Sequence, residues 1–360
     1  MGGAASTGPT LRTADTGQVA GLTAVAVLTL AVGLGTSAAV FGVADAALLR
    51  ALPVHAPQEL VGFRSFVRSN GLAPMLLGSS SPADGGWTST SFSLATFRAV
   101  SERGRAYADV FGFADLYRVS LTFDGRAEMG SGILVSGNYF EVLGMAPATG
   151  RTLTDADDRP GAAPVVVISH AYWQQHGAEM EVIGTAMTGN GVACTIVGVM
   201  PRGFHGTGQV DQSTQVAVPL SMRAMVRRDF ESTQWETPDL WWVLMMGRLA
   251  AETSPAHARD ALEVVVQQSV AADAPSLPAD ALPRLILFPG RGGQEEARTA
   301  MRSTITMMGL VVMVVLLVVC ANVAPPPNSA RSLLNMNAFS HRLGSPTWHR
   351  RDRPGEPPSV

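Results

Sequence analysis

The sequence predicts a membrane protein in which two transmembrane α-helices flank a mixed α+β extracytoplasmic domain. Two long apolar runs carry this prediction, one over residues 22–49 and the other over residues 305–323. Neither run contains Arg or Lys, and Asp45 is the only ionised side chain in either of them. A run of roughly 18 or more apolar residues can cross a ~30 Å hydrocarbon core as a helix. The Gly- and Pro-rich stretch between the runs has the composition of a folded domain outside the membrane.

The arginines that flank the two runs predict the orientation. Arg12 precedes the first run. Several arginines follow the second run: Arg331, Arg342, Arg350, Arg351 and Arg353. Cytoplasmic loops carry an excess of basic residues, so we expect both termini in the cytoplasm and the central domain on the other side. The first run is about twice as long as the apolar part of a signal peptide, which favours an uncleaved anchor.

These observations divide the chain into five segments. We expect a disordered cytoplasmic lead at 1–18, a first transmembrane helix with an extracytoplasmic extension at 19–49, and an extracytoplasmic domain at 50–303. A second transmembrane helix is expected at 304–324, and a disordered tail rich in Pro and Arg at 325–360. The three consecutive prolines that open the tail cannot continue a helix, and no apolar period follows them.

The first apolar run contains small residues spaced four apart. Gly35 pairs with Ala39 in this spacing, and Ala38 pairs with Gly42. Such pairs let a second helix approach closely, so these four residues are candidate helix-packing positions for a homodimer. The alternative is that glycine is simply common in membrane helices, and the sequence alone leaves both interpretations open.

Strands are expected at several places in the central domain. The segments with β-branched or alternating apolar residues are 59–64, 119–123, 132–135, 164–169, 240–249 and 285–288. Asp124-Gly125 marks a hairpin turn between two of them, and Gly189-Asn190-Gly191 marks a second hairpin within 186–199.

Helices and loops are expected between these strands. Ser93 is a candidate N-cap for a helix over 94–103, and a short helix is expected over 170–181. Ser254-Pro255 fits the N-cap and first position of a third helix. Residues 78–91 and 271–283 are expected to be a loop and a linker. Strands and helices do not alternate strictly, which favours an α+β or mixed α/β domain.

Composition excludes several classes of function. The sequence contains no lysine, and a P-loop ATPase needs its lysine to reach the nucleotide phosphates. The net charge of −3 gives no indication of a nucleic-acid partner. Cys194 and Cys320, the only cysteines, fall in the central domain and in the second apolar run, so we expect neither a disulfide nor a zinc site.

Two groups of candidate metal ligands fail on their spacing. The acids at 155, 157 and 158 begin like a calcium loop, but Arg159 and Pro160 occupy the positions that need a ligand and a glycine. A turn capped by Thr154 or Asp155 explains these acids better. His170 and His176 are six residues apart, which is off the i,i+4 register of one helix face. No nucleophile motif is present, so we expect no catalytic, metal or cofactor site and no enzyme activity of the chain itself.

Several ordered motifs resemble one family. They include the first apolar run with its continuation to Pro53, the segment Val135-Ser-Gly-Asn-Tyr-Phe-Glu-Val-Leu-Gly144, and the segment Thr195-Ile-Val-Gly-Val-Met-Pro-Arg-Gly-Phe204. Further motifs are at 150–158, 166–173, 182–184 and 319–323. Together they resemble the MacB-type or FtsX-like permeases of ABC transporters, especially the bacterial group of duplicated permeases, over roughly residues 18–324.

The resemblance implies a function and a set of partners. It implies a permease subunit of the cell inner membrane, with a periplasmic core that divides into a porter-like part and a second subdomain. A separate cytoplasmic ABC ATPase would hydrolyse ATP, and the permease would pass the motion to the extracytoplasmic domain for export (efflux) or mechanotransmission. The family's motifs in this region define no catalytic residue to carry over.

Two other functions remain open at this point. The first is a membrane-anchored regulatory or binding protein that acts on a periplasmic partner. The second is an anchored extracytoplasmic enzyme, against which the absence of a nucleophile motif argues. An ATPase gene beside the gene for this chain would favour export, and a cell-wall hydrolase gene would favour regulation.

The chain departs from the family pattern after Ala324. The family continues with a basic cytoplasmic stretch and at least two further membrane helices, whereas a Pro-rich tail follows here. The tail resembles a truncated or frameshifted end. We therefore expect that this chain alone neither hydrolyses ATP nor transports a substrate.

Overall fold

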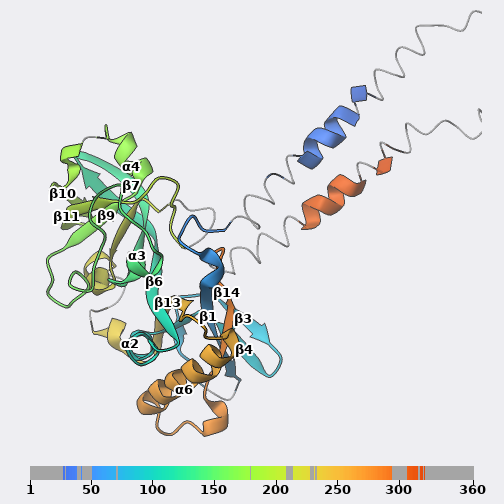
Figure 1. Cartoon of the computed structure of the whole chain (residues 1–360), viewed down its shortest axis with the longest axis vertical. Helices are drawn as coiled ribbons and strands as arrows, with labels where there is room; N and C mark the ends of the chain where they lie inside the picture. The colour runs from blue at the N-terminus through green and yellow to red at the C-terminus, as the bar shows by residue number, and fades with distance from the viewer. Residues whose placement is uncertain are drawn as a thin grey trace, which may run out of the picture. The chain divides into compact units, whose positions relative to one another are not determined.

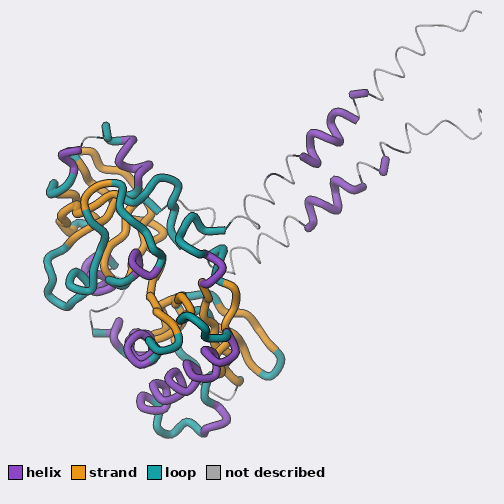
Figure 2. Tube along the Cα trace, in the orientation of Figure 1, coloured by secondary structure: helices purple, strands orange, loops and turns teal. Residues whose placement is uncertain are grey.

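The computed structural model describes two units of the chain, each considered by itself. The described residues are 27–28, 30–38, 42, 51–69, 72–178, 180–207, 214–227, 231, 233–293, 306–314, 317–318 and 320. One unit comprises residues 1–42 and 305–360, and the other, here called the core unit, comprises residues 43–304. Figures 1 and 2 show the elements of both units.

The first unit contains the described parts of the two apolar runs. Residues 30–38 and 306–314 are helical (Figure 2). Among the residues that the structure describes, no helix is both long enough and apolar enough to cross a membrane. The lead predicted at 1–18 and the tail predicted at 325–360 lie outside the described residues.

Six elements of the core unit follow the order strand, helix, strand, strand, helix, strand. They are β1 (Leu60–Arg68), α2 (Leu94–Arg103), β6 (Ala108–Phe123), β13 (Leu240–Leu249), α6 (Pro255–Asp273) and β14 (Arg284–Pro289). The strands pair antiparallel in the order β14–β1–β13–β6, which is the split βαβ arrangement of ferredoxin-like folds. Helix α2 packs on α6, β6 and β13, and α6 packs on β14 (Figure 1). We call this part the first lobe.

Both helices of the first lobe begin where the sequence predicts. The hydroxyl of Ser93 accepts a hydrogen bond of 3.1 Å from the backbone N–H of Thr96, and the hydroxyl of Ser254 accepts one of 3.2 Å from His257. These caps satisfy backbone donors that the first helical turn leaves free. Helix α2 buries the side chains of Leu94, Phe97 and Val100 toward the core, as its apolar spacing predicts.

The predicted loop at 78–91 is wrong, because this segment forms strands. β3 (Ser80–Ala83) and β4 (Gly86–Ser89) form a hairpin, and β4 pairs antiparallel with β1. The turn between them contains Gly85 at φ 74°, a conformation that favours glycine. Short strands β2 (Met75–Leu76) and β5 (Ser91–Ser93) pair with β13. The Ser- and Gly-rich composition signals a loop, but the unpaired edge of β1 supplies backbone partners that override this local preference.

A second lobe is inserted between β6 and β13. Its strands are β7 (Arg126–Val135), β8 (Thr149–Gly150), β9 (Val165–Ile168), β10 (Ala186–Gly189), β11 (Val192–Val199) and β12 (Val216–Pro219). Its helices and turns are α3 (Tyr139–Val142), α4 (His170–Gln175), η3 (Met180–Val182), η4 (Leu220–Met222), α5 (Arg223–Val226) and η5 (Gln234–Glu236). We call this part the inserted lobe.

The sheet of the inserted lobe closes on itself. Its strands pair in the order β6–β7–β12–β9–β11–β10, and β10 pairs back onto β6 through Thr188 opposite Thr122 and Gly189 opposite Leu121. The interior is filled with apolar side chains: Leu116, Val119, Leu121, Val166, Met187, Cys194 and Val216. Cys194 is a free thiol in this interior, and burial raises its pKa to about 11.

The two predicted hairpin turns are confirmed, and two helix boundaries are wrong. Asp124 and Gly125 both have positive φ between β6 and β7, and so do Asn190 and Gly191 between β10 and β11. The helix predicted over 170–181 ends at Gln175, because the two residues after His176 adopt positive φ and cannot continue it. The helix after Ser254 runs to Asp273, so it extends into the segment predicted as a linker.

Candidate functional site

The chain enters and leaves the core unit at one place. The backbone N–H of Leu52 donates a hydrogen bond of 2.8 Å to the carbonyl oxygen of Arg291. Beside it, the N–H of Gly290 donates one of 2.7 Å to the carbonyl of Leu60. The segment that leads in from the first apolar run is therefore paired with the segment that leads out to the second. We call this place the junction.

Arg248 fastens the lead-in segment to the rest of the core unit. This residue lies on β13, and its side chain is only 17% exposed. Its guanidinium donates hydrogen bonds to the carbonyls of His55 and Ala56 and to the carboxylate of Glu59, the last at 2.9 Å. Its Nε donates a bond of 3.0 Å to the carbonyl of Val142, at the end of α3 in the inserted lobe. One side chain of the first lobe thus holds both the lead-in segment and the inserted lobe.

A backbone contact strengthens the same connection. The N–H of His55 donates a hydrogen bond of 3.1 Å to the carbonyl of Leu143. Gly144 follows in the left-handed region at φ 66°, and a Cβ at this position would press on the side chain of His55. The lead-in segment is consequently seated on the C-terminal end of α3.

A cleft of about 300 Å³ separates α2 of the first lobe from loops of the inserted lobe. Charged side chains line it from both sides: Arg98, Glu102, Arg105, Asp155, Asp158, Arg223 and Glu236. A guanidinium nitrogen of Arg98 on α2 lies 3.8 Å from a carboxylate oxygen of Glu236. Both side chains are more than half exposed, so this ion pair contributes little stability. Asp158 accepts a hydrogen bond of 2.7 Å from the N–H of Ser221, and burial raises the pKa of its carboxyl to about 6.

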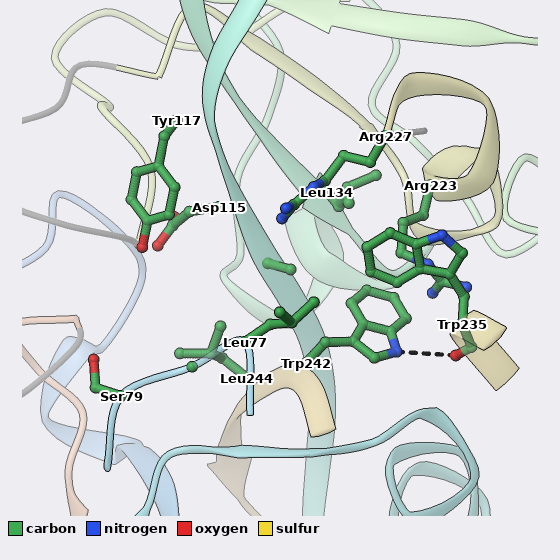
Figure 3. A pocket seen from close by; sticks show the side chains of 12 residues that line it. Leu77, Ser79, Asp115, Tyr117, Leu134, Arg223, Arg227, Trp235, Trp242 and Leu244 are labelled. Carbon is green, nitrogen blue, oxygen red and sulfur yellow. Dashed lines mark hydrogen bonds between the residues drawn. The ribbon is translucent and has the colours of Figure 1, made fainter. Parts of the chain in front are cut away.

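Arg223 lines this cleft and packs against Trp235 and Trp242 (Figure 3). It is 5% exposed, and its Cζ lies 3.7 Å from the ring centre of Trp242 and 4.4 Å from that of Trp235. The indole N–H of Trp242 donates a hydrogen bond of 3.1 Å to the carbonyl of Trp235, which fixes the two rings. Burial lowers the pKa of Arg223 to about 9, and cation–π attraction to two rings offsets part of the cost of burying the charge.

The other side of Arg223 borders a small cavity of about 30 Å³. Asp115 of β6 also lines this cavity, and Figure 3 shows its carboxylate beside the hydroxyl of Tyr117, away from Arg223. Burial raises the pKa of Asp115 to about 6, while the hydrogen bond from Tyr117 opposes this shift. Asp115, Arg223, Trp235 and Trp242 lie where the two lobes meet, and we call this region the joint.

The candidate packing residues of the first apolar run are described in part. Gly35, Ala38 and Gly42 are helical and exposed, and Ala39 lies outside the described residues. A Cβ added at Gly35 or Gly42 would meet no atom within 4 Å. These positions therefore have room for a second helix, and their role in packing stays a prediction.

The rejected metal ligands have other partners. Asp157 accepts two hydrogen bonds from Arg151, at 2.7 and 2.8 Å, and one of 2.9 Å from the N–H of Thr154. The expected turn is present, but its cap is Asp157 rather than Thr154 or Asp155. His170 packs on Trp173, whereas His176 packs on Phe123 and Tyr172. Across the described part of the chain, no group of three or more His, Cys, Asp or Glu side chains could hold a metal ion.

The sequence reasoning missed the residues of the junction and of the joint. Arg248 is the only charge in the apolar strand from Leu240 to Leu249, and this isolation was a usable signal. Arg223 carries no comparable signal, because its tryptophan neighbours become close only through folding.

Comparison with known proteins places the chain in a family. The family described as "MacB-like periplasmic core domain" matches residues 23–265, which is more than half of the chain. The chain belongs to this family, whose members are periplasmic regions of MacB- or FtsX-like ABC transporter permeases that work with an ATPase partner. No match was found among curated proteins.

Three solved structures resemble the chain at low identity. The periplasmic region of MacB from Actinobacillus actinomycetemcomitans is 13% identical, with 68% of this chain and 92% of that chain covered and a TM-score of 0.42. A domain of a putative permease protein from Porphyromonas gingivalis is 15% identical, with 66% and 90% covered and a TM-score of 0.44. The extracellular domain of the noncanonic ABC-type transporter YknZ from Gram-positive bacteria is 12% identical, with 63% and 99% covered and a TM-score of 0.40.

Proposed function

We propose that this chain is a permease subunit, or a fragment of one, in a MacB- or FtsX-like ABC transporter. In this proposal the core unit is extracytoplasmic and is held between two membrane helices at 19–49 and 304–324. A separate cytoplasmic ATPase supplies the energy, and the core unit passes the motion on for export or mechanotransmission. The observation that carries the proposal is the hydrogen bond between Leu52 and Arg291, because it joins the two ends through which both helices would act.

Arg248 supports the mechanical part of the proposal. A displacement of the lead-in segment would pull on the carbonyls of His55 and Ala56, which share one guanidinium with the carbonyl of Val142. Hydrogen bonds to a charged donor are stronger than neutral ones, so the segment and both lobes would move together. The cleft beside α2 gives the two lobes a surface at which they can shift relative to each other.

The proposed partners are the lipid bilayer, the ATPase and a second copy of the chain. The pairs Gly35/Ala39 and Ala38/Gly42 would pack the first helices of two copies closely. Replacing Gly35 with Ile should then lower the dimer fraction measured in micelles, and an unchanged fraction would argue against packing through this face.

A second candidate is a membrane-anchored regulatory or binding protein that acts on a periplasmic partner. The observation that favours it is the charged cleft of about 300 Å³, which reaches the size range of small-ligand sites. Under either proposal, the chain itself would catalyse no reaction.

Complex formation with the ATPase tests the proposal. The full chain would be tagged, co-expressed with the ABC ATPase encoded beside its gene, and purified in detergent. We expect the ATPase to co-elute in a fixed ratio, and the chain alone in liposomes to show no ATP turnover above the lipid background. An ATPase that never co-elutes with a chain shown to be folded by circular dichroism would contradict the permease assignment.

A further inference from the structure

A groove of about 400 Å³ lies on the inserted lobe. It is bounded by the end of β6, by α4 and by the segment from η3 to β10. The residues that line it are Phe123, Asp124, Ile168, Tyr172, Trp173, His176, Glu181, Val182, Thr185 and Ala186. A volume of this size is in the range of small-molecule sites.

Aromatic rings form much of the wall. The ring of Tyr172 lies 4.3 Å from that of His176 at an angle of 32°, and Phe123 meets His176 edge-on at 5.6 Å. The Nδ1–H of His176 donates to the carbonyl of Tyr172 at 2.9 Å, so the imidazole is held in place. Phe123, Trp173 and His176 are partly exposed and can present π surfaces to a ligand, whereas Tyr172 is buried.

The charge of the lining is negative. The carboxylates of Asp124 and Glu181 line the groove, and no arginine is among its lining residues. Behind His176, the carboxylate of Glu128 lies 3.5 Å from Nε2. Aromatic faces together with carboxylates attract a cation through the ring quadrupole and through Coulomb attraction.

A third carboxylate, that of Glu128, lies next to the buried end of this wall. Tyr172 is 1% exposed, and both its hydroxyl and the Nε2 of His176 lie close to the carboxylate of Glu128. Burial, and then the Glu128 carboxylate, raise the pKa of Tyr172, so the hydroxyl keeps its proton at neutral pH.

We propose that this groove is a binding site for a small soluble organic cation, such as an alkylammonium compound. The ammonium group would lie against the rings of Phe123 and Trp173, close to Asp124 and Glu181. The inference concerns the inserted lobe alone and does not depend on the permease function.

Choline and its uncharged counterpart provide the test. Isothermal titration of the full chain in detergent would compare choline with 3,3-dimethylbutan-1-ol, which has the same shape and no charge. We expect choline to bind and the neutral alcohol to bind at least about tenfold more weakly, because it lacks the cation–π and carboxylate attraction. Equal binding of the two compounds, or no binding of choline, would overturn the proposal.

Matched variants locate the site. Asp124→Asn combined with Glu181→Gln removes two carboxylates and keeps the side-chain shapes, and asparagine tolerates the positive φ at 124. This pair should weaken choline binding at least about fivefold. Glu141→Gln, on the exposed side of α3, removes a charge elsewhere and should leave binding unchanged. Equal weakening by both changes would show a general charge effect, and binding only to phosphatidylcholine vesicles would show a lipid surface site; either result would contradict a soluble ligand in this groove.

Discussion

The backbone N–H of Leu52 and the carbonyl oxygen of Arg291 form a hydrogen bond of 2.8 Å, although 239 positions (291 − 52) separate the two residues. The bond closes the core unit where the chain enters and leaves it. A unit closed in this way has its own core and its own ends, so it should fold without the segments on either side.

The first prediction concerns the independence of the core unit. A fragment of residues 52–303, which contains both closing residues, should unfold in one cooperative thermal transition monitored by circular dichroism. A fragment that expresses well but melts without a transition would mean that the core unit depends on the flanking helices.

The second prediction concerns Arg248. Arg248→Met keeps the apolar stem but leaves the carbonyls of His55, Ala56 and Val142 without their donor. These acceptors are partly buried or exposed, so water replaces part of the lost bonding, and the free energy of unfolding should fall by about 1.5–3 kcal/mol. Chemical denaturation of the purified chain measures this loss.

Arg259→Met is the matched control for Arg248. Arg259 is exposed on α6 and pairs with its exposed neighbour Asp260, so its removal should change stability by less than about 0.5 kcal/mol. Similar losses in the two variants would show that the bonds of Arg248 have no special weight.

A third prediction follows from Asp115. Its pKa is raised from 3.8 to about 6 by burial, so the folded state holds the proton more tightly than the unfolded state. The stability from this proton is fully present below about pH 4 and is lost as the pH rises through about 6. Asp115→Asn should therefore match the native chain at pH 4 and exceed its stability at pH 7.5, by up to about 3 kcal/mol. Chemical denaturation of the variant and of the native chain at both pH values checks this prediction. The same difference in stability at pH 4 and at pH 7.5 would exclude a role for the proton.

How far the sequence predicted the fold depends on how local each signal is. Ser93 and Ser254 cap their helices as expected, because a cap involves only residues of the next turn. Strand β13 also has the predicted bounds, since a ten-residue apolar run leaves little choice. The closure of the inserted lobe was not foreseeable, because the pairing of Thr188 with Thr122 joins strands that are far apart in sequence.

The candidate sites show the same limit. The small residues near Gly35 were found from their spacing, but no described contact tests them. The joint was missed because Trp235 and Trp242 come together with Arg223 from three different elements. Among the residues named for the junction and the joint, Arg248 alone has a signal in the sequence, because it is the one charge within an apolar strand.

A fourth prediction uses two glycines of neighbouring strands. A Cβ at Gly198 of β11 would overlap the carbonyl oxygen of Arg151, whereas one at Gly189 of β10 would meet only the side chain of Val119 at 3.8 Å. Gly198→Ala should cost at least about 2 kcal/mol of stability, and Gly189→Ala should change it by less than about 0.5 kcal/mol. Urea denaturation of both variants gives the comparison, and similar costs would contradict the close approach of β11 to Arg151.

The orientation of the core unit tests the central claim most directly. Alkaline phosphatase, which is active outside the cytoplasm, and a green fluorescent protein that is fluorescent inside it, would each be fused after residue 303 and after residue 324. We predict phosphatase activity without fluorescence after 303, and fluorescence without phosphatase activity after 324. Phosphatase activity after residue 324, or fluorescence after residue 303, would contradict a core unit held outside the membrane between two spanning helices.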